Sequence, residues 1–138
     1  MLEAKVVEKI DADVDAVWPE ISNFRSIKPG PGIEAVDYEG DGVGMTRHVK
    51  TANGTIVERL ESLDDKDHVF SYAIINDDGP LPFADYSAVV RLEADDSGGT
   101  TVNWVGTFVS RGLEDDKAVE LACNIYKNLI NQARQAVT

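Results

Sequence analysis

Two charged residues stand in a segment that otherwise has the pattern of buried β-strands. Residues 57–75, VERLESLDDKDHVFSYAII, read as two strands joined by a turn, and Glu58 and Arg59 are neighbours in the first of them. Neighbouring side chains of a strand point to opposite faces of a sheet, so one of these charges must point inward. An inward carboxylate has two chemical uses: it is a fixed hydrogen-bond acceptor, and it is a general acid or base.

The alternation of apolar residues indicates which charge points inward. If Glu58 points inward, Ile56 and Leu60 share its face, and Arg59 and Glu61 face solvent. The opposite phase buries two charges, Arg59 and Glu61, in place of one. We therefore expect Glu58 on the inner face and Arg59 on the outer face.

The preceding strand supplies a charge of the opposite sign. If Val49 points inward, Arg47 points inward with it. A buried carboxylate without a partner costs several kcal/mol, so a guanidinium close to Glu58 is expected. Two interpretations remain open and are compatible. The pair satisfies itself, or it forms the polar floor of a pocket and orients an oxygen of a ligand.

Tyrosines are the other polar groups that the alternation places inside. A buried tyrosine needs a hydrogen-bond partner for its hydroxyl. The small Ala118 and Ala122 of the last helix leave room beside the sheet. No residue is assigned a catalytic role. The candidate ligand-binding residues are Arg47, Val49, Glu58, Leu60, Tyr72, Tyr86, Ala88, Trp104, Phe108, Ala122 and Tyr126.

Metal and cofactor chemistry find no support in the sequence. The two histidines and the single Cys123 do not cluster at metal-ligand spacing. We expect His48 to point outward, His68 to be exposed beside a turn, and Cys123 to be buried as a small hydrophobe. The glycines of residues 40–45, GDGVGM, precede a strand and not a helix, so they are not a dinucleotide fingerprint. No cofactor and no metal are expected.

The elements that must position these side chains follow from periodicity. Residues 3–11 predict a strand, and Asp13 is a candidate N-cap of a short helix that Pro19 should kink or end. A second short helix is expected over residues 23–27. Six strands with short turns follow between Ile33 and Ser110, which indicates an antiparallel meander.

The end of the chain has a different pattern. Residues 114–137 contain no glycine or proline, and three acidic residues stand in the first turn, where negative charge suits the helix dipole. One apolar stripe recurs at steps of three and four residues and must be buried against a sheet. It consists of Val119, Ala122, Cys123, Tyr126, Leu129, Ile130, Ala133 and Val137.

Length and charge limit the class of protein. A chain of 138 residues predicts one domain, 1–138, and its net charge of −12 argues against nucleic acid and anionic membrane surfaces as partners. No apolar run reaches the roughly 18 residues of a membrane span, and the charged N-terminus is not a signal peptide. A single cysteine fits a reducing, cytoplasmic setting. We expect a monomer or a weak homodimer.

Five segments of the sequence, taken with their order along the chain, resemble those of the START-like, helix-grip superfamily. This superfamily includes the birch-pollen allergen family, the polyketide cyclase/dehydrase-like proteins and the plant abscisic-acid receptors. The resemblance implies an α+β fold, with a curved seven-stranded antiparallel sheet wrapped around a long C-terminal helix and two short helices between strands 1 and 2. It also implies an apolar cavity into which Glu58 points. The matching segments are ADVDAVWPEISNF, GVGMTRHV, VERLESLDDKDHVFSYAII, FADYSAVVRL and TTVNWVGTF.

Residues 46–88 are most similar to the hormone receptors of this superfamily. By that resemblance KTANGT (50–55) is a gate-like loop, and DDGPLP (77–82) is a second loop at the cavity mouth. The Ser-Gly-Leu-Pro gate of the receptors is replaced here, and their carboxylate-anchoring lysine has no clear counterpart. A hormone receptor is therefore not expected.

Two hypotheses on function remain. The first is a binding protein for a small hydrophobic or amphipathic molecule, such as a lipid, a polyketide or an isoprenoid. The second is a cyclase or dehydratase that uses Glu58, Tyr72, Tyr86 or Arg47 as an acid or base. The first is favoured, because the sequence shows no nucleophile–base pair and no metal site.

Overall fold

A seven-stranded antiparallel sheet and a long C-terminal helix form the molecule. The structure, a computed structural model, describes residues 1–138. The helices are α1 (Val14–Ser22) and α2 (Asp115–Val137). The strands are β1 (Leu2–Ile10), β2 (Ala35–Glu39), β3 (Thr46–Thr51), β4 (Gly54–Asp64), β5 (Val69–Ile74), β6 (Phe83–Ala94) and β7 (Thr100–Ser110).

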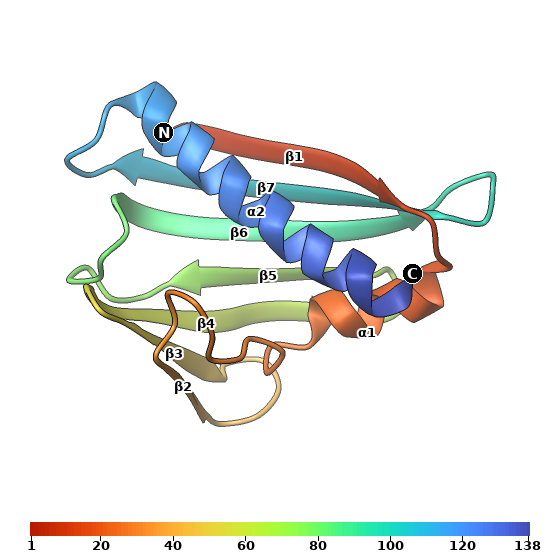
Figure 1. Cartoon of the computed structure of the whole chain (residues 1–138), viewed down its shortest axis with the longest axis horizontal. Coiled ribbons are helices and arrows are strands. Elements are labelled where there is room, and N and C mark those ends of the chain that lie inside the picture. The colour runs from red at the N-terminus through yellow and green to blue at the C-terminus, as the bar shows by residue number, and fades with distance from the viewer.

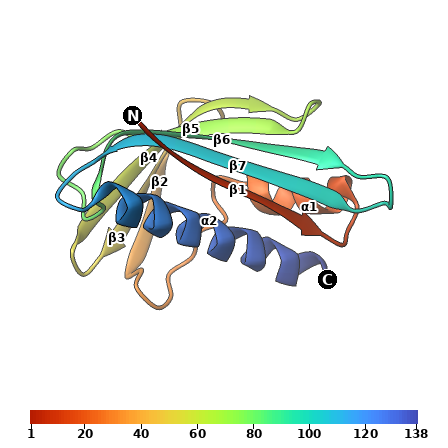
Figure 2. The same ribbon diagram turned by 90° about the horizontal axis from the view of Figure 1, so that it is seen from above.

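The sheet is a meander from β2 to β7, and β1 forms the edge strand beside β7. Its order is β1-β7-β6-β5-β4-β3-β2, so every pair except β1–β7 joins strands that follow each other in the chain. Figure 1 shows α2 running diagonally over one face of this sheet. In the turned view the sheet curves around the helix, and β2 and β3 lie at its bent end (Figure 2). The predicted helix-grip fold is confirmed.

One short helix, not two, connects β1 and β2. The Asp13 side chain accepts a hydrogen bond from the backbone N–H of Asp15 (3.2 Å) and caps α1 as expected. The helix continues for three residues beyond Pro19, because Val17, Trp18 and Ile21 are buried and their packing offsets the lost backbone bond.

The second short helix expected over residues 23–27 is not formed, so that prediction is wrong. Asn23 has extended backbone angles, and its side chain accepts a hydrogen bond from the backbone N–H of Arg25 (3.0 Å). A local bond of this kind competes with a helical one. The chain then runs without helix or strand from Ser26 to the start of β2.

Small residues let α2 approach only one part of the sheet. Ala4, Gly106 and Ala88 lie side by side on β1, β7 and β6. A side chain at Gly106 is not possible without rearrangement, because its Cβ would lie 1.9 Å from the Tyr126 hydroxyl. The packing of α2 is mainly against β1, and also against β7 and α1. Space therefore remains between α2 and the strands from β3 to β5.

The buried face of α2 is slightly rotated from the predicted stripe. Ile130 is fully buried, whereas Leu129 and Val119 are half-buried. Cys123 is also half-buried and not buried as expected, since it lies at the edge of the β1 contact, with its Sγ 3.9 Å from the Lys5 carbonyl. Neither helix is both long and apolar enough to cross a membrane.

Two β-bulges shift which residues point inward. In β4 the register changes between Leu60 and Ser62. In β6 it changes between Ala84 and Ser87, where Asp85 has a positive φ of 52°. The extra residue in β6 places both Phe83 and Tyr86 in the core.

Candidate ligand-binding cavity

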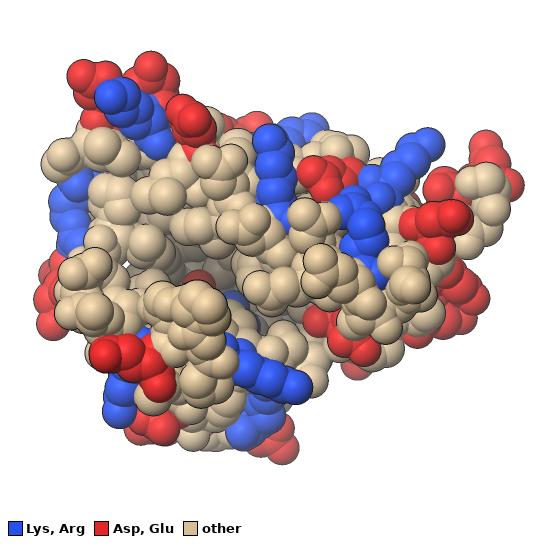
Figure 3. All heavy atoms as spheres, in the orientation of Figure 1, with Lys and Arg blue, Asp and Glu red and all other residues tan.

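A two-lobed cavity occupies the space that α2 leaves uncovered. The lobe next to α1, here called the outer lobe, has a volume of about 430 Å³, and the lobe that Glu58 lines, here called the inner lobe, has a volume of about 220 Å³. Figure 3 shows the hollow from the α2 side, with acidic and basic atoms visible at its bottom. Both lobes are lined by Ile27, Ile33, Arg47, Tyr72 and Leu129, so they adjoin.

The inner lobe is the more apolar of the two. Twelve of its 15 lining residues are hydrophobic. Apart from the shared residues, the sheet and the loop before β6 contribute Val49, Thr51, Ile56, Glu58, Ile74, Leu81, Phe83 and Tyr86, and α2 contributes Ile125 and Tyr126.

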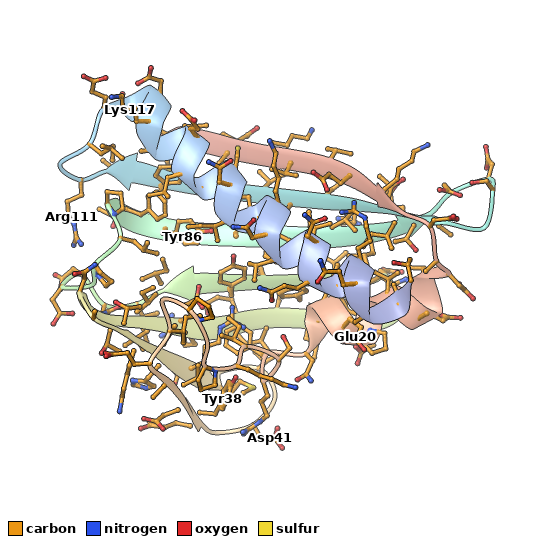
Figure 4. The ribbon with its side chains drawn as sticks, in the orientation of Figure 1. Glu20, Tyr38, Asp41, Tyr86, Arg111 and Lys117 are labelled. Atoms are coloured by element: carbon orange, nitrogen blue, oxygen red, sulfur yellow. The ribbon has the colours of Figure 1, made fainter.

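The outer lobe is more polar and lies toward α1. It is lined by Glu20 of α1, by residues 26–31 and Ile33, and by Gln132 of α2. Figure 4 shows Glu20 at this end of the molecule. Phe70 and Trp104 form its sheet side.

The floor of the cavity carries the expected ion pair. Arg47 and Glu58 are register partners on β3 and β4, and the Arg47 Nε donates to the Glu58 Oε1 (2.7 Å). Their side chains are only 8% and 12% exposed. Arg59 points outward, with 44% of its side chain exposed. The predicted strand phase is thus confirmed.

Arg47 is held from three further sides. Its Nη1 donates to the carbonyl of Phe24 (3.3 Å). Its guanidinium carbon lies 3.9 Å from the centre of the Phe24 ring and 5.7 Å from that of Tyr72, within the range of cation–π attraction. The turn that replaces the expected second helix therefore supplies both a carbonyl and a ring to the site.

A hydroxyl cluster lies beside the ion pair. The Tyr86 hydroxyl is 2.5 Å from that of Tyr126 and 3.3 Å from that of Tyr72. The Trp104 Nε1 donates to the Tyr72 hydroxyl (3.2 Å). Figure 4 shows Tyr86 on β6 beneath α2. All buried side-chain polar atoms of the chain have a partner.

Burial makes these three tyrosine hydroxyls weaker acids than that of a solvent-exposed tyrosine. Desolvation, followed by the negative charge of Glu58, raises the pKa of Tyr72 to about 12. Desolvation also raises the pKa of Tyr86 and of Tyr126 above the ordinary value. The three hydroxyls are neutral hydrogen-bonding groups at physiological pH, as ordinary tyrosines are, and the raised pKa values extend this neutral range to higher pH.

The structure separates the candidate residues into two groups. Seven line the cavity: Arg47, Val49, Glu58, Tyr72, Tyr86, Trp104 and Tyr126. Four do not, and their proposed place in the lining is corrected: Leu60, Ala88, Phe108 and Ala122. These four are buried in the main hydrophobic core, with at most 2% of each residue exposed.

Sequence reasoning missed the contribution of the segment before β2. Phe24, Ile27 and Ile33 belong to the site, but a helix was expected over residues 23–27, and the segment instead forms a turn followed by irregular chain. Phe83 was also missed, because only the β6 bulge turns it inward. Leu81 belongs to the loop DDGPLP (77–82), which the resemblance placed at the cavity mouth, but no periodicity indicated the direction of its side chain.

The loop between β5 and β6 is fixed beside the cavity. The Asn76 side chain accepts from the backbone N–H of Val57 (2.9 Å). Arg111 donates to the carbonyls of Asp77, Gly79 and Leu81, and Figure 4 shows it at the end of β7 on this side. These bonds hold Leu81 against the inner lobe.

The histidines lie outside the cavity. His48 is paired in register with Asp37 and Val57, on the outer phase of β3 as predicted. His68 is half-buried and not exposed, because its ring packs edge-on against Trp18 at 5.3 Å. No group of three or more histidine, cysteine, aspartate or glutamate side chains has the geometry of a metal site.

Comparison with known proteins decides the family. Residues 1–136 match the family model described as polyketide cyclase / dehydrase and lipid transport. The chain belongs to this family. The match covers almost all of the chain, including every element that lines the cavity.

Two curated proteins of related sequence come from Arabidopsis thaliana. The abscisic acid receptor PYL6 is 28% identical over 113 residues, which are 75% of this chain and 53% of the receptor. The abscisic acid receptor PYL7 is 33% identical over 93 residues, or 63% of this chain and 43% of the receptor. The chain thus spans about half the length of these relatives.

Solved structures support the same fold. The protein XoxI from Bacillus cereus has a TM-score of 0.83 and 29% identity, with 99% of this chain and 96% of that chain covered. Ara h 8.0201 has a TM-score of 0.79 at 16% identity, with 97% and 95% covered. The predicted START-like and birch-pollen-allergen-like superfamily is confirmed.

Proposed function

We propose that this member of the family binds a small hydrophobic or amphipathic molecule, such as a lipid, a polyketide or an isoprenoid, between the sheet and α2. The observation that carries the proposal is the inner lobe, an apolar space with one ion pair on its floor. Ligand sites of proteins are typically apolar pockets of about 300–1,000 Å³ with a few fixed polar groups, and the two adjoining lobes fit this description.

The geometry favours binding over catalysis. An effective general acid has a pKa near the working pH. Burial raises the pKa of Tyr72 to about 12, so its hydroxyl is a hydrogen-bond donor that rarely gives up its proton. Glu58 is held in an ion pair with Arg47. The cyclase or dehydratase alternative therefore gains no support from this arrangement.

Dye binding to variants with a filled cavity tests the proposal. A neutral apolar dye such as Nile red should bind one-to-one with a micromolar Kd, which corresponds to about −8 kcal/mol. Leu129→Trp should abolish this binding, because Leu129 lines both lobes. Ile74→Trp fills the inner lobe from the sheet side and should have the same effect.

The matched control places the same bulk on the outer face of the sheet. Val89 is 45% exposed there, so Val89→Trp should bind the dye as the wild type does. Circular dichroism checks that each variant folds. Undiminished binding by folded Leu129→Trp and Ile74→Trp would show that the dye binds elsewhere, and the proposal would fail.

Three expectations about partners and location rest on composition and stay predictions. They are a monomer or weak homodimer, no nucleic-acid partner, and a cytoplasmic location. A role as a hormone receptor is not proposed, since KTANGT stands where the receptors carry their gate sequence.

A further inference from the structure

The charges that line the cavity balance each other. Arg47 and Glu58 form the floor pair, with 2.7 Å between Nε and Oε1. Lys28 and Glu20 are the only other charged residues of the lining, and both belong to the outer lobe. Since each cation is matched by an anion, the cavity holds no surplus charge that would neutralise an ionised ligand.

The floor pair keeps one hydrogen-bonding atom of each partner free. The Glu58 Oε1 accepts from Nε of Arg47, and Nη1 of Arg47 donates to Phe24. The Glu58 Oε2 and the Arg47 Nη2 form no hydrogen bond within the chain. Because every buried side-chain polar atom of the chain does form one, these two atoms are not buried. Both residues line the inner lobe, so both atoms are accessible there. The floor thus presents one acceptor beside one donor.

This arrangement discriminates between kinds of polar group. A hydroxyl or a primary amide both donates and accepts, so it can donate to the Glu58 carboxylate and accept from Arg47. A ligand carboxylate can only accept, and it would lie beside the like charge of Glu58. Specificity of this kind depends on what a site repels as well as on what it attracts.

The whole molecule acts in the same direction. Its net charge of −12 lowers the concentration of anions near the surface. The tyrosine hydroxyls beside the floor carry no charge, and burial raises the pKa of Tyr72 and of Tyr86 further above physiological pH. Neither feature attracts an anionic ligand.

We infer that the cavity selects an electrically neutral amphipathic ligand, an apolar body that carries a hydroxyl or amide group, over a carboxylate with the same carbon skeleton. The inference rests on the proposed function, since it concerns the ligand of the same cavity. The polar group contacts Arg47 and Glu58, and the apolar body occupies the inner lobe and extends along α2.

Three ligands that share a ten-carbon chain test the inference. Decanol, decanamide and decanoate compete with Nile red at neutral pH, where decanoate is ionised. The wild type should bind the alcohol and the amide at least about tenfold more tightly than the carboxylate. Decanoate binding as tightly as decanol would overturn the inference, whereas failure of all three to bind would instead overturn the proposed function.

A charge-removing variant separates this effect from ordinary partitioning. Any apolar site binds a neutral ligand more tightly than a charged one. The decisive quantity is therefore the ratio of the decanol affinity to the decanoate affinity, compared between Glu58→Gln and the wild type. This variant removes the like charge and leaves Arg47, so the ratio should fall at least about fivefold. Arg59→Gln changes a charge on the outer face of the same strand and should leave the ratio unchanged. An equal ratio in Glu58→Gln and the wild type would refute the inference.

Discussion

Removal of Glu58 tests whether the floor pair is desolvated. Glu58→Ala breaks the 2.7 Å bond to Nε and leaves the Arg47 charge with one carbonyl and two aromatic rings. A charge-assisted hydrogen bond contributes about 1.5–3 kcal/mol, and removing one partner of a fully buried pair costs about 3–5 kcal/mol. Both side chains retain a little accessible surface at the cavity, so we expect a loss of about 3 kcal/mol.

Equilibrium urea unfolding, followed by far-UV circular dichroism, measures this loss. The double variant Arg47→Met/Glu58→Leu should lose much less than Glu58→Ala, because neither charge is then left without its partner. Arg59→Ala is the matched control on the same strand and should keep the wild-type midpoint, since Arg59 is exposed. If Glu58→Ala unfolds within about 0.5 kcal/mol of the wild type, the pair is solvated and the reasoning is wrong.

Three further predictions concern the packing around the cavity. Gly106→Ala should cost about 1–3 kcal/mol, since its Cβ would overlap the Tyr126 hydroxyl, and Tyr126→Phe in the same chain should recover part of that loss in urea unfolding. Stability should fall above about pH 10, where an unfolded tyrosine ionises but folded Tyr72 keeps its proton up to about pH 12. The slope should reach about 1.4 kcal/mol per pH unit for each such tyrosine, and a flat profile of unfolding midpoints between these pH values would contradict it. Ile130→Ala should cost about 2–5 kcal/mol, as truncation of a fully buried side chain does, and Leu129→Ala should cost less because Leu129 faces the cavity; equal losses would show that Leu129 is core.

The sequence predicted the fold because its periodicities are strong. Alternation along residues 56–60 was enough to point Glu58 inward, and the spacing of Ala122, Tyr126 and Ile130 was enough to place α2 on a sheet. In both cases a regular element repeats one simple geometry. Side-chain direction could therefore be read from position alone.

The rest of the site depends on irregular backbone that no periodicity describes. The bulge in β6, where Asp85 has a positive φ, adds one residue to the strand. This extra residue turns Phe83 to the inner face of the sheet. Phe24 approaches Arg47 from a turn fixed by the Asn23 side chain, where a helix was expected.

Four of the candidate residues fell outside the cavity for a similar reason. An inward direction places a side chain in the core but does not say what covers it. Ala88 and Ala122 have the correct direction, but their small side chains are covered by close packing between α2 and the sheet. Whether an inward side chain reaches the cavity depends on the size of every neighbouring side chain. The alternation along one strand contains no information about these neighbours.

Methyl NMR spectroscopy during a titration with decanol tests the central claim most directly. If the cavity binds the ligand, the methyl resonances of Ile27, Ile125 and Leu129 should shift together and saturate at one equivalent, since these side chains line it. Val7 and Val89 are exposed elsewhere on the molecule and should not shift. Shifts confined to Val7 and Val89, or no saturable shift at the three lining residues, would contradict the account.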